Sequence, residues 1–230
     1  MLYKLNQLLL VAASLYVLRL AVTDKLILYI HPRYVIFTIV MAVIALVLSV
    51  ISFGSTKSKL PIRNALIYIP FALIVISGLI FVPKSLSSYS VSQRSVDNSL
   101  TSSGRAEDTL SYYGGSSKNL SLVDWSRLLV RNTNPDYYTN KEVDVIGFLY
   151  DDGSDDSFQI ARFVVTCCTV DAQPTGLQVS KPNWASNYEQ DEWLRIVGTI
   201  KEVGAGQDKK LMLVPDSIEK VEEPDNPYVN

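Results

Sequence analysis

The stretch DEWLRIVGTIKEV, residues 191–203, has the composition of a β-strand and places Gly198 where such a strand must bend. Four more stretches in the same half of the chain also predict strands: KEVDVIGFLYDD (141–152), FQIARFVVTCC (158–168), PTGLQVS (174–180) and KKLMLVPDSIEKVEE (209–223). Pro215 in the last stretch indicates a bend or an edge. Five strands of this kind predict a small closed barrel of the oligonucleotide/oligosaccharide-binding (OB-like) type. A small antiparallel sandwich is the alternative.

One helix is predicted before the first strand. In SLVDWSRLLVRN, residues 121–132, Ser121 can cap the helix and Asp124 stands three residues later, as in a capping box. The apolar residues that share one face are Leu122, Trp125, Leu128 and Leu129. The helix should therefore pack against the strands, and together they predict a β-rich domain over residues 119–230.

The front of the chain, residues 1–83, is apolar and predicts about three membrane spans. Residues 34–53 and 64–82 are runs without a charged residue, long enough to cross a hydrocarbon core of roughly 30 Å. Residues 5–22 form a third candidate, with Arg19 near one end, where it can snorkel to the interface. A secretory signal peptide is the competing interpretation of this first run.

Charge patterning orients these spans. Lys57, Lys59 and Arg63 lie between the second and third runs, with no acidic residue among them. Because positive loops stay in the cytoplasm, the pattern predicts a multi-pass protein of the cell membrane. Its Ser/Gly-rich linker, residues 84–118, and the barrel domain are then extracytoplasmic.

The back half of the chain is acidic. Residues 84–230 contain 14 Lys and Arg against 22 Asp and Glu. Nucleic-acid binding depends on basic residues that displace counterions, so this half excludes a nucleic-acid partner. The same charge should repel anionic lipid from this half, whereas the apolar front half predicts membrane lipid as a partner.

The only two cysteines of the chain, Cys167 and Cys168, are adjacent. If both lie in a strand, one faces the core and the other faces outward, and the pair is then structural. Unpaired thiols are a liability outside the cytoplasm, which favours a functional role instead. Two thiolates suit Zn²⁺ or Cu⁺, and Asp171 is the nearest third ligand. Asp171 as a turn residue is the alternative.

The single histidine, His31, precedes Pro32 and Arg33 at the start of the second span. Proline at a first helical position favours a capping loop here. A ligand for a transported ion is the alternative role of His31, and Arg33 beside it is a further candidate. The sequence contains no GxSxG, HExxH or phosphate-loop motif, so we do not expect an enzyme.

The segments YIHPRY, CCTVDAQPTGL, DEWLRIVGTI and EEPDNPYVN, in this order, resemble the YcgQ family of bacterial membrane proteins. Members of that family have a hydrophobic N-terminal region and a C-terminal domain with a double cysteine followed by an Asp-Ala pair, here Asp171 and Ala172. The resemblance implies a partner of a YraQ/YcgR-type permease and a link to zinc starvation.

Three functions follow from these patterns. The first is a membrane-anchored accessory subunit of a permease, with an outer domain that binds or presents a metal ion or metal complex through Cys167 and Cys168. The second is a membrane-bound thiol enzyme. The third is a module that binds a cell-wall component or another ligand, in which the cysteines are structural.

Overall fold

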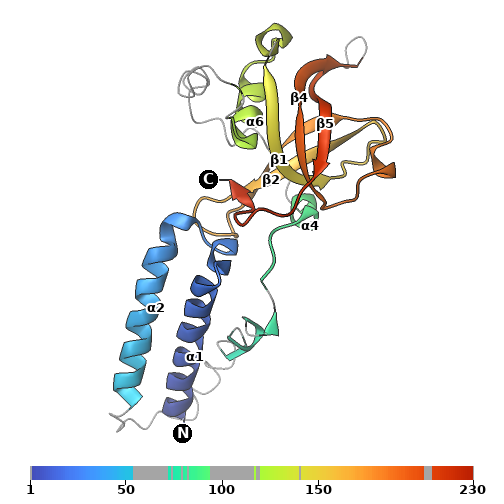
Figure 1. Cartoon of the computed structure of the whole chain (residues 1–230). Helices are drawn as coiled ribbons and strands as arrows, with labels where there is room; N and C mark the ends of the chain where they lie inside the picture. The colour runs from blue at the N-terminus through green and yellow to red at the C-terminus, as the bar shows by residue number, and fades with distance from the viewer. Residues whose placement is uncertain are drawn as a thin grey trace. The chain divides into compact units, whose positions relative to one another are not determined.

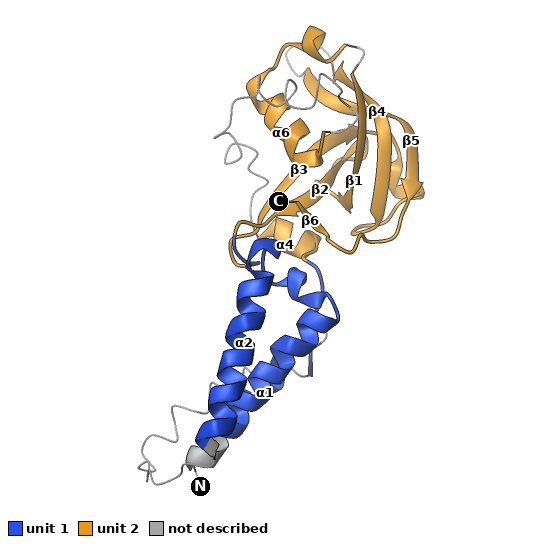
Figure 2. Cartoon of the chain, turned by 60° about the vertical axis from the view of Figure 1, so that its left-hand side comes forward, with its two compact units in different colours: residues 1–85, 167–169 blue, residues 86–166, 170–230 orange. Residues whose placement is uncertain are grey.

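The structure is a computed structural model that describes residues 2–53, 72–73, 75–78, 80–81, 83–93, 117, 120–139, 141–204 and 209–229. The chain divides into two compact units (Figure 2). The helical unit comprises residues 1–85 together with residues 167–169, and the barrel unit comprises residues 86–166 and 170–230. A loop of the second half of the chain is therefore part of the helical unit.

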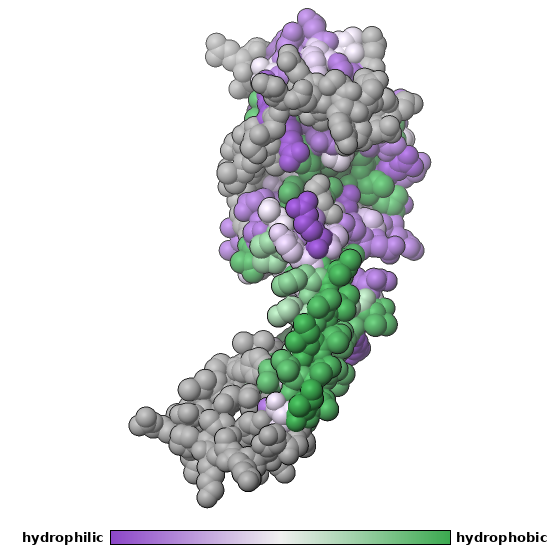
Figure 3. Space-filling view, turned by 90° about the vertical axis from the view of Figure 1, so that its left-hand side faces the viewer, coloured by the Kyte–Doolittle hydropathy of each residue, from purple (hydrophilic) through white to green (hydrophobic). Residues whose placement is uncertain are grey.

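The helical unit consists of α1 (Leu2–Val22), the short 3-10 helix η1 (Lys25–Leu28) and α2 (Pro32–Phe53). The two α-helices pack side by side (Figure 1). Residues 32–52 of α2 are long and apolar enough to cross a membrane, by length and composition. Figure 3 shows the apolar side chains of this unit gathered in green. The large exposed apolar residues of α2 are Ile36, Phe37, Val40, Met41, Val43, Ile44, Val47, Leu48, Val50 and Ile51.

Within the described residues, α2 is the one helix that satisfies these criteria, so the expected number of three spans is not found. The first predicted span, residues 5–22, lies in α1, where the apolar segment Gln7–Val22 is shorter than a full span. Its polar residues include Gln7 and Ser14, both buried, which lower its hydropathy. The third predicted span, residues 64–82, falls largely outside the described residues.

The barrel has five strands: β1 (Glu142–Tyr150), β2 (Ser157–Val164), β3 (Gln173–Ser180), β4 (Trp193–Val203) and β5 (Lys210–Lys220). They pair in the order β1-β4-β5-β3-β2, and pairing of β1 with β2 closes the ring. The neighbours are antiparallel except β3 and β5, which are parallel. The prediction of a five-stranded barrel is confirmed. The alternative, a small antiparallel sandwich, is not what the structure shows. A short strand that was not predicted, β6 (Tyr228–Val229), pairs in parallel with the end of β2, at Phe163 and Val164.

The bend predicted at Gly198 is a register shift between β4 and β5. Gly198 lies opposite Pro215, whereas the preceding Val197 lies opposite Ser217, so Asp216 is an extra residue in β5. A Cβ atom on Gly198 would stand 2.2 Å from the carbonyl oxygen of Val214, so no other residue fits here without movement of the backbone.

The predicted helix is α6 (Leu122–Arg131), and its capping box is present. The Ser121 hydroxyl accepts a hydrogen bond from the Asp124 N–H at 3.3 Å, and the Asp124 carboxylate accepts one from the Ser121 N–H at 3.0 Å. Leu122, Trp125 and Leu128 are buried in the barrel core, as their shared face predicts. Two 3-10 helices, η5 (Pro135–Tyr138) and η6 (Trp184–Ser186), complete this unit.

The start of the predicted linker packs on the barrel. Within residues 84–118, α4 (Ser88–Ser92) buries Val91 in a second apolar cluster of the barrel unit. The backbone N–H and the hydroxyl of Ser88 donate hydrogen bonds to the carboxylate of Asp191, at 2.7 and 2.9 Å. Residues 94–116 of the predicted linker lie outside the described residues.

Candidate functional site

The paired cysteines lie in the loop between β2 and β3, and not in a strand. β2 ends at Val164, after which Val165 is still buried, but Cys167 is exposed and Cys168 is half-buried. The expectation that one thiol faces the core is therefore wrong. The strand stops early because Asp171 closes a turn, accepting a hydrogen bond from the N–H of Thr166 at 3.2 Å. The turn interpretation of Asp171 agrees with this bond.

The bend in this loop brings the two sulfur atoms together. The Sγ of Cys167 and the Sγ of Cys168 are 3.5 Å apart, and the two cysteines do not form a disulfide. This separation is far longer than a disulfide of about 2.05 Å. Two sulfurs 3.5 Å apart can share one ion at zinc–sulfur distances of about 2.3 Å with a bond angle of about 100°, near the tetrahedral value. The geometry fits two thiolate ligands on a single ion.

The cysteine loop pairs with the loop between α1 and α2, within the helical unit. Ile30 and Cys168 form an antiparallel bridge. The N–H of His31 donates a hydrogen bond to the carbonyl oxygen of Cys167 at 3.0 Å, and the N–H of Thr169 donates one to the carbonyl oxygen of Tyr29 at 2.9 Å. Because these two bonds flank the Ile30–Cys168 pair, its side chains stand close together.

His31 is the cap of α2 in this arrangement. Its Nδ1 accepts a hydrogen bond from the backbone N–H of Arg33 at 3.0 Å, and its carbonyl oxygen accepts one from the N–H of Tyr34 at 2.9 Å. A neutral imidazole whose Nδ1 is an acceptor has its proton on Nε2, so neither nitrogen offers a free lone pair to a metal. The structure supports the capping role of His31. Arg33 takes part in this cap through its backbone N–H.

A third protein ligand is not in place beside the cysteines. Throughout the described part of the chain, no three His, Cys, Asp or Glu side chains are grouped so as to hold a metal ion. Asp171 belongs to the barrel unit, whereas Cys167 and Cys168 belong to the helical unit. The metal-ligand predictions for Cys167, Cys168 and Asp171 remain predictions, and the geometry favours the two sulfurs alone.

The barrel has a cleft of about 420 Å³ beside β2, β3 and β5, with both polar and apolar residues in its walls. Its walls include the hydroxyls of Ser154 and Ser157, the amide of Gln178 and the ammonium of Lys210. The Gln178 Nε2 donates hydrogen bonds to the Asp152 carboxylate at 2.9 Å and to the Ser157 hydroxyl at 3.1 Å. These contacts hold the Gln178 amide in one orientation. The sequence pattern did not single out these residues, because isolated serines and amides on strands are common on any solvated surface.

The described residues define a class of protein: a closed five-stranded barrel domain with preceding helices, one of them apolar enough for a membrane, and two adjacent cysteines without a disulfide. Residues 120–230 match the family model described as the DUF1980 C-terminal domain. The match spans the barrel and α6, just under half of the chain, and the function of that family is not established. No curated protein matches the chain.

Proposed function

We propose that this protein is a membrane-anchored accessory subunit of a permease, and that Cys167 and Cys168 bind a thiophilic metal ion, Zn²⁺ or Cu⁺. One observation carries the metal assignment: the sulfur atoms of two adjacent cysteines that form no disulfide lie 3.5 Å apart. A structural explanation of the pair is weak, because neither cysteine is buried in the core.

Two protein ligands leave a metal ion open to exchange. A structural zinc site is closed by four protein ligands, whereas an ion on two thiolates keeps positions for water or for a donor from another protein. Such an ion is held loosely and can be passed on. The site is thus suited to presenting an ion, and less suited to storing one. The acidic balance of residues 84–230 raises the local concentration of cations around it.

The anchoring role is supported by α2, whose large apolar side chains are exposed along the helix. A helix that is apolar on all sides needs lipid or other helices around it. The resemblance of the sequence to permease partners favours helices of a permease as part of that surrounding. The loop that carries Cys167 and Cys168 is then the portion that meets the ion outside the cytoplasm.

Metal analysis of the purified full chain tests this proposal. We expect close to one zinc or copper ion per chain after equilibration with a stoichiometric supply, and a loss of most of it in Cys167→Ser/Cys168→Ser. Thr169→Ser, in the same loop without loss of a thiol, is the matched control and should keep the ion. Equal metal content in all three proteins would contradict the proposal.

The cleft beside β2, β3 and β5 favours a second candidate function, a module that binds a small ligand such as a cell-wall sugar, which has both polar hydroxyls and apolar ring faces. Its walls offer hydroxyl, amide and ammonium groups at one place. Gln178→Ala should then abolish binding of cell-wall fragments to the purified chain and leave its metal content unchanged. Binding that persists in Gln178→Ala would remove this candidate.

A further inference from the structure

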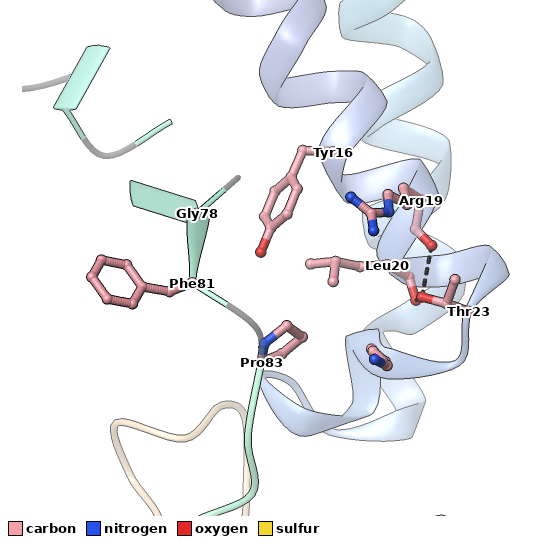
Figure 4. Close-up of a pocket in the computed structure, with 8 residues that line it drawn as sticks. Tyr16, Arg19, Leu20, Thr23, Gly78, Phe81 and Pro83 are labelled. Atoms are coloured by element: carbon pink, nitrogen blue, oxygen red, sulfur yellow. Dashed lines mark hydrogen bonds between the residues drawn. The ribbon is translucent and has the colours of Figure 1, made fainter. Parts of the chain in front are cut away.

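A small pocket lies within the helical unit at the end of α1, between its last turns and residues 78–83 (Figure 4). Its volume is about 150 Å³. This is roughly five times the share of liquid volume of one water molecule, about 30 Å³. A tetrahedral oxyanion such as phosphate fits in a space of this size.

Two cations and no acidic residue are among the described residues that line the pocket. Arg19 comes from the last turn of α1 and Lys25 from η1. Neither side chain forms an ion pair with any described residue. The hydroxyl of Thr23 donates a hydrogen bond to the backbone carbonyl oxygen of Arg19 at 2.9 Å, a contact that does not involve the Arg19 guanidinium. The two positive groups therefore remain available to an anion.

The pocket also contains an unsatisfied hydroxyl. The OH of Tyr16 is buried and has no hydrogen-bond partner among the described residues. A buried polar group without a partner costs about 1–3 kcal/mol, which an acceptor on a ligand would recover. Gly78 makes room for this ring, since a Cβ atom there would stand 3.2 Å from Cε1 of Tyr16. Figure 4 shows Tyr16 and Arg19 at the same opening.

We propose that this pocket binds the phosphate group of an anionic phospholipid through Arg19, Lys25 and the hydroxyl of Tyr16. A phosphate accepts hydrogen bonds from all three donors, and its charge pairs with the two cations. Lipid is favoured over free phosphate because large apolar side chains flank the opening. Val22 is 85% exposed and Phe81, which lines the pocket, is 72% exposed. These side chains can contact acyl chains, an arrangement that rests on the membrane anchoring proposed above.

Titration of the full chain in a nonionic detergent tests the proposal. The probes are dioctanoyl phosphatidylglycerol, inorganic phosphate and dioctanoylglycerol, which lacks the phosphate. We expect the phospholipid to bind most tightly and dioctanoylglycerol not to bind measurably. Arg19→Gln and Lys25→Gln should each weaken phospholipid binding about tenfold or more, since a hydrogen bond to a charged group contributes about 1.5–3 kcal/mol. Tyr16→Phe, which keeps the ring, should weaken it less.

Lys84→Gln is the matched control, because Lys84 is an exposed cation beside the pocket that does not line it. Equal weakening in Lys84→Gln, or equal binding of dioctanoylglycerol, would overturn the site. Inorganic phosphate that binds as tightly as the phospholipid would overturn lipid as the source. Retention in alkali-washed membranes reports the anchoring separately, so loss of lipid selectivity and loss of anchoring are distinguished.

Discussion

The Sγ atoms of Cys167 and Cys168 lie 3.5 Å apart at the surface of the protein. The backbone of this loop is fixed by hydrogen bonds from His31 to Cys167 and from Thr169 to Tyr29. The bridge between Ile30 and Cys168 therefore fixes the backbone that carries the two thiols, through contacts between main-chain atoms. The sulfurs are pre-arranged for a common ligand, and the loop can lose them without losing its backbone contacts.

Cys167→Ser and Cys168→Ser should each change the free energy of unfolding by no more than about 0.5 kcal/mol, the range of surface substitutions. The reason is that neither thiol is part of the core. Denaturant titration measures this change. Val165→Ala, two residues before the pair and 2% exposed, should cost about 1–3 kcal/mol as a control. A cost above about 2 kcal/mol for either cysteine would show that it packs in the core after all.

Gly198→Ala should destabilise the barrel by about 3 kcal/mol or more, because its Cβ would collide with backbone atoms that cannot move alone. Thermal unfolding followed by circular dichroism measures the loss. Ser217→Ala, on the neighbouring strand and exposed, should be near neutral. If both variants melt at the wild-type temperature, the close contact described here between β4 and β5 at Gly198 would be contradicted.

Tyr138→Phe should destabilise the protein at neutral pH by about 1–3 kcal/mol. The Tyr138 hydroxyl donates to the carbonyl oxygens of Leu128 at 2.9 Å and Asn132 at 2.5 Å, and both would lose this donor. Burial, and to a smaller extent the nearby Tyr137, raises the pKa of Tyr138 above its ordinary value of about 10.

This direction gives a pH dependence. Because the folded pKa of Tyr138 is raised, the stabilisation is fully present below pH 10 and is lost as the pH rises above it. Denaturant titrations from pH 7 to pH 12 should show the advantage of the wild type over Tyr138→Phe shrinking in the alkaline range. An advantage that stays constant up to pH 12 would contradict the buried, donating hydroxyl.

The orientation predicted from Lys57, Lys59 and Arg63 places the barrel outside the cytoplasm. In a background without native cysteines, Ser186→Cys, an exposed position in η6, should react with a membrane-impermeant maleimide in intact cells. Ser58→Cys, between the second and third predicted spans, should react only after lysis. The reverse pattern would place the barrel in the cytoplasm.

The barrel was predictable because its signals are local. Alternating strands are separated by turn residues, and the Ser121–Asp124 pair marks the start of α6. A glycine inside a strong strand pattern predicted that β4 bends at Gly198, where the structure shows the close approach of β5. The two-residue strand β6 and the five-residue helix α4 were missed, since segments this short have no measurable period.

The site was less predictable because its contacts are distant in the sequence. The apolar run that leads into Cys167 suggested a longer strand, although Asp171, whose carboxylate accepts the hydrogen bond from Thr166, was also interpreted as a turn residue. The pairing of residues 29–31 with 167–169 joins two loops far apart in the chain and leaves no pattern in either. Of the predicted spans, only the one in α2 is long and apolar enough within the described residues, because the described side chains of α1 begin at Gln7 and the third span falls largely outside them.

The central claim is that two thiolates bind one ion, and pH-dependent metal affinity tests it most directly. Protons compete with a metal for a thiolate, and a free cysteine has a pKa of about 8.5. We predict that the affinity of the full chain for Zn²⁺ or Cu⁺ falls steadily as the pH drops from 8 to 6. Either single variant, Cys167→Ser or Cys168→Ser, should lose most of the affinity at every pH. An affinity that is independent of pH and unchanged in both single variants would contradict a metal site at Cys167 and Cys168.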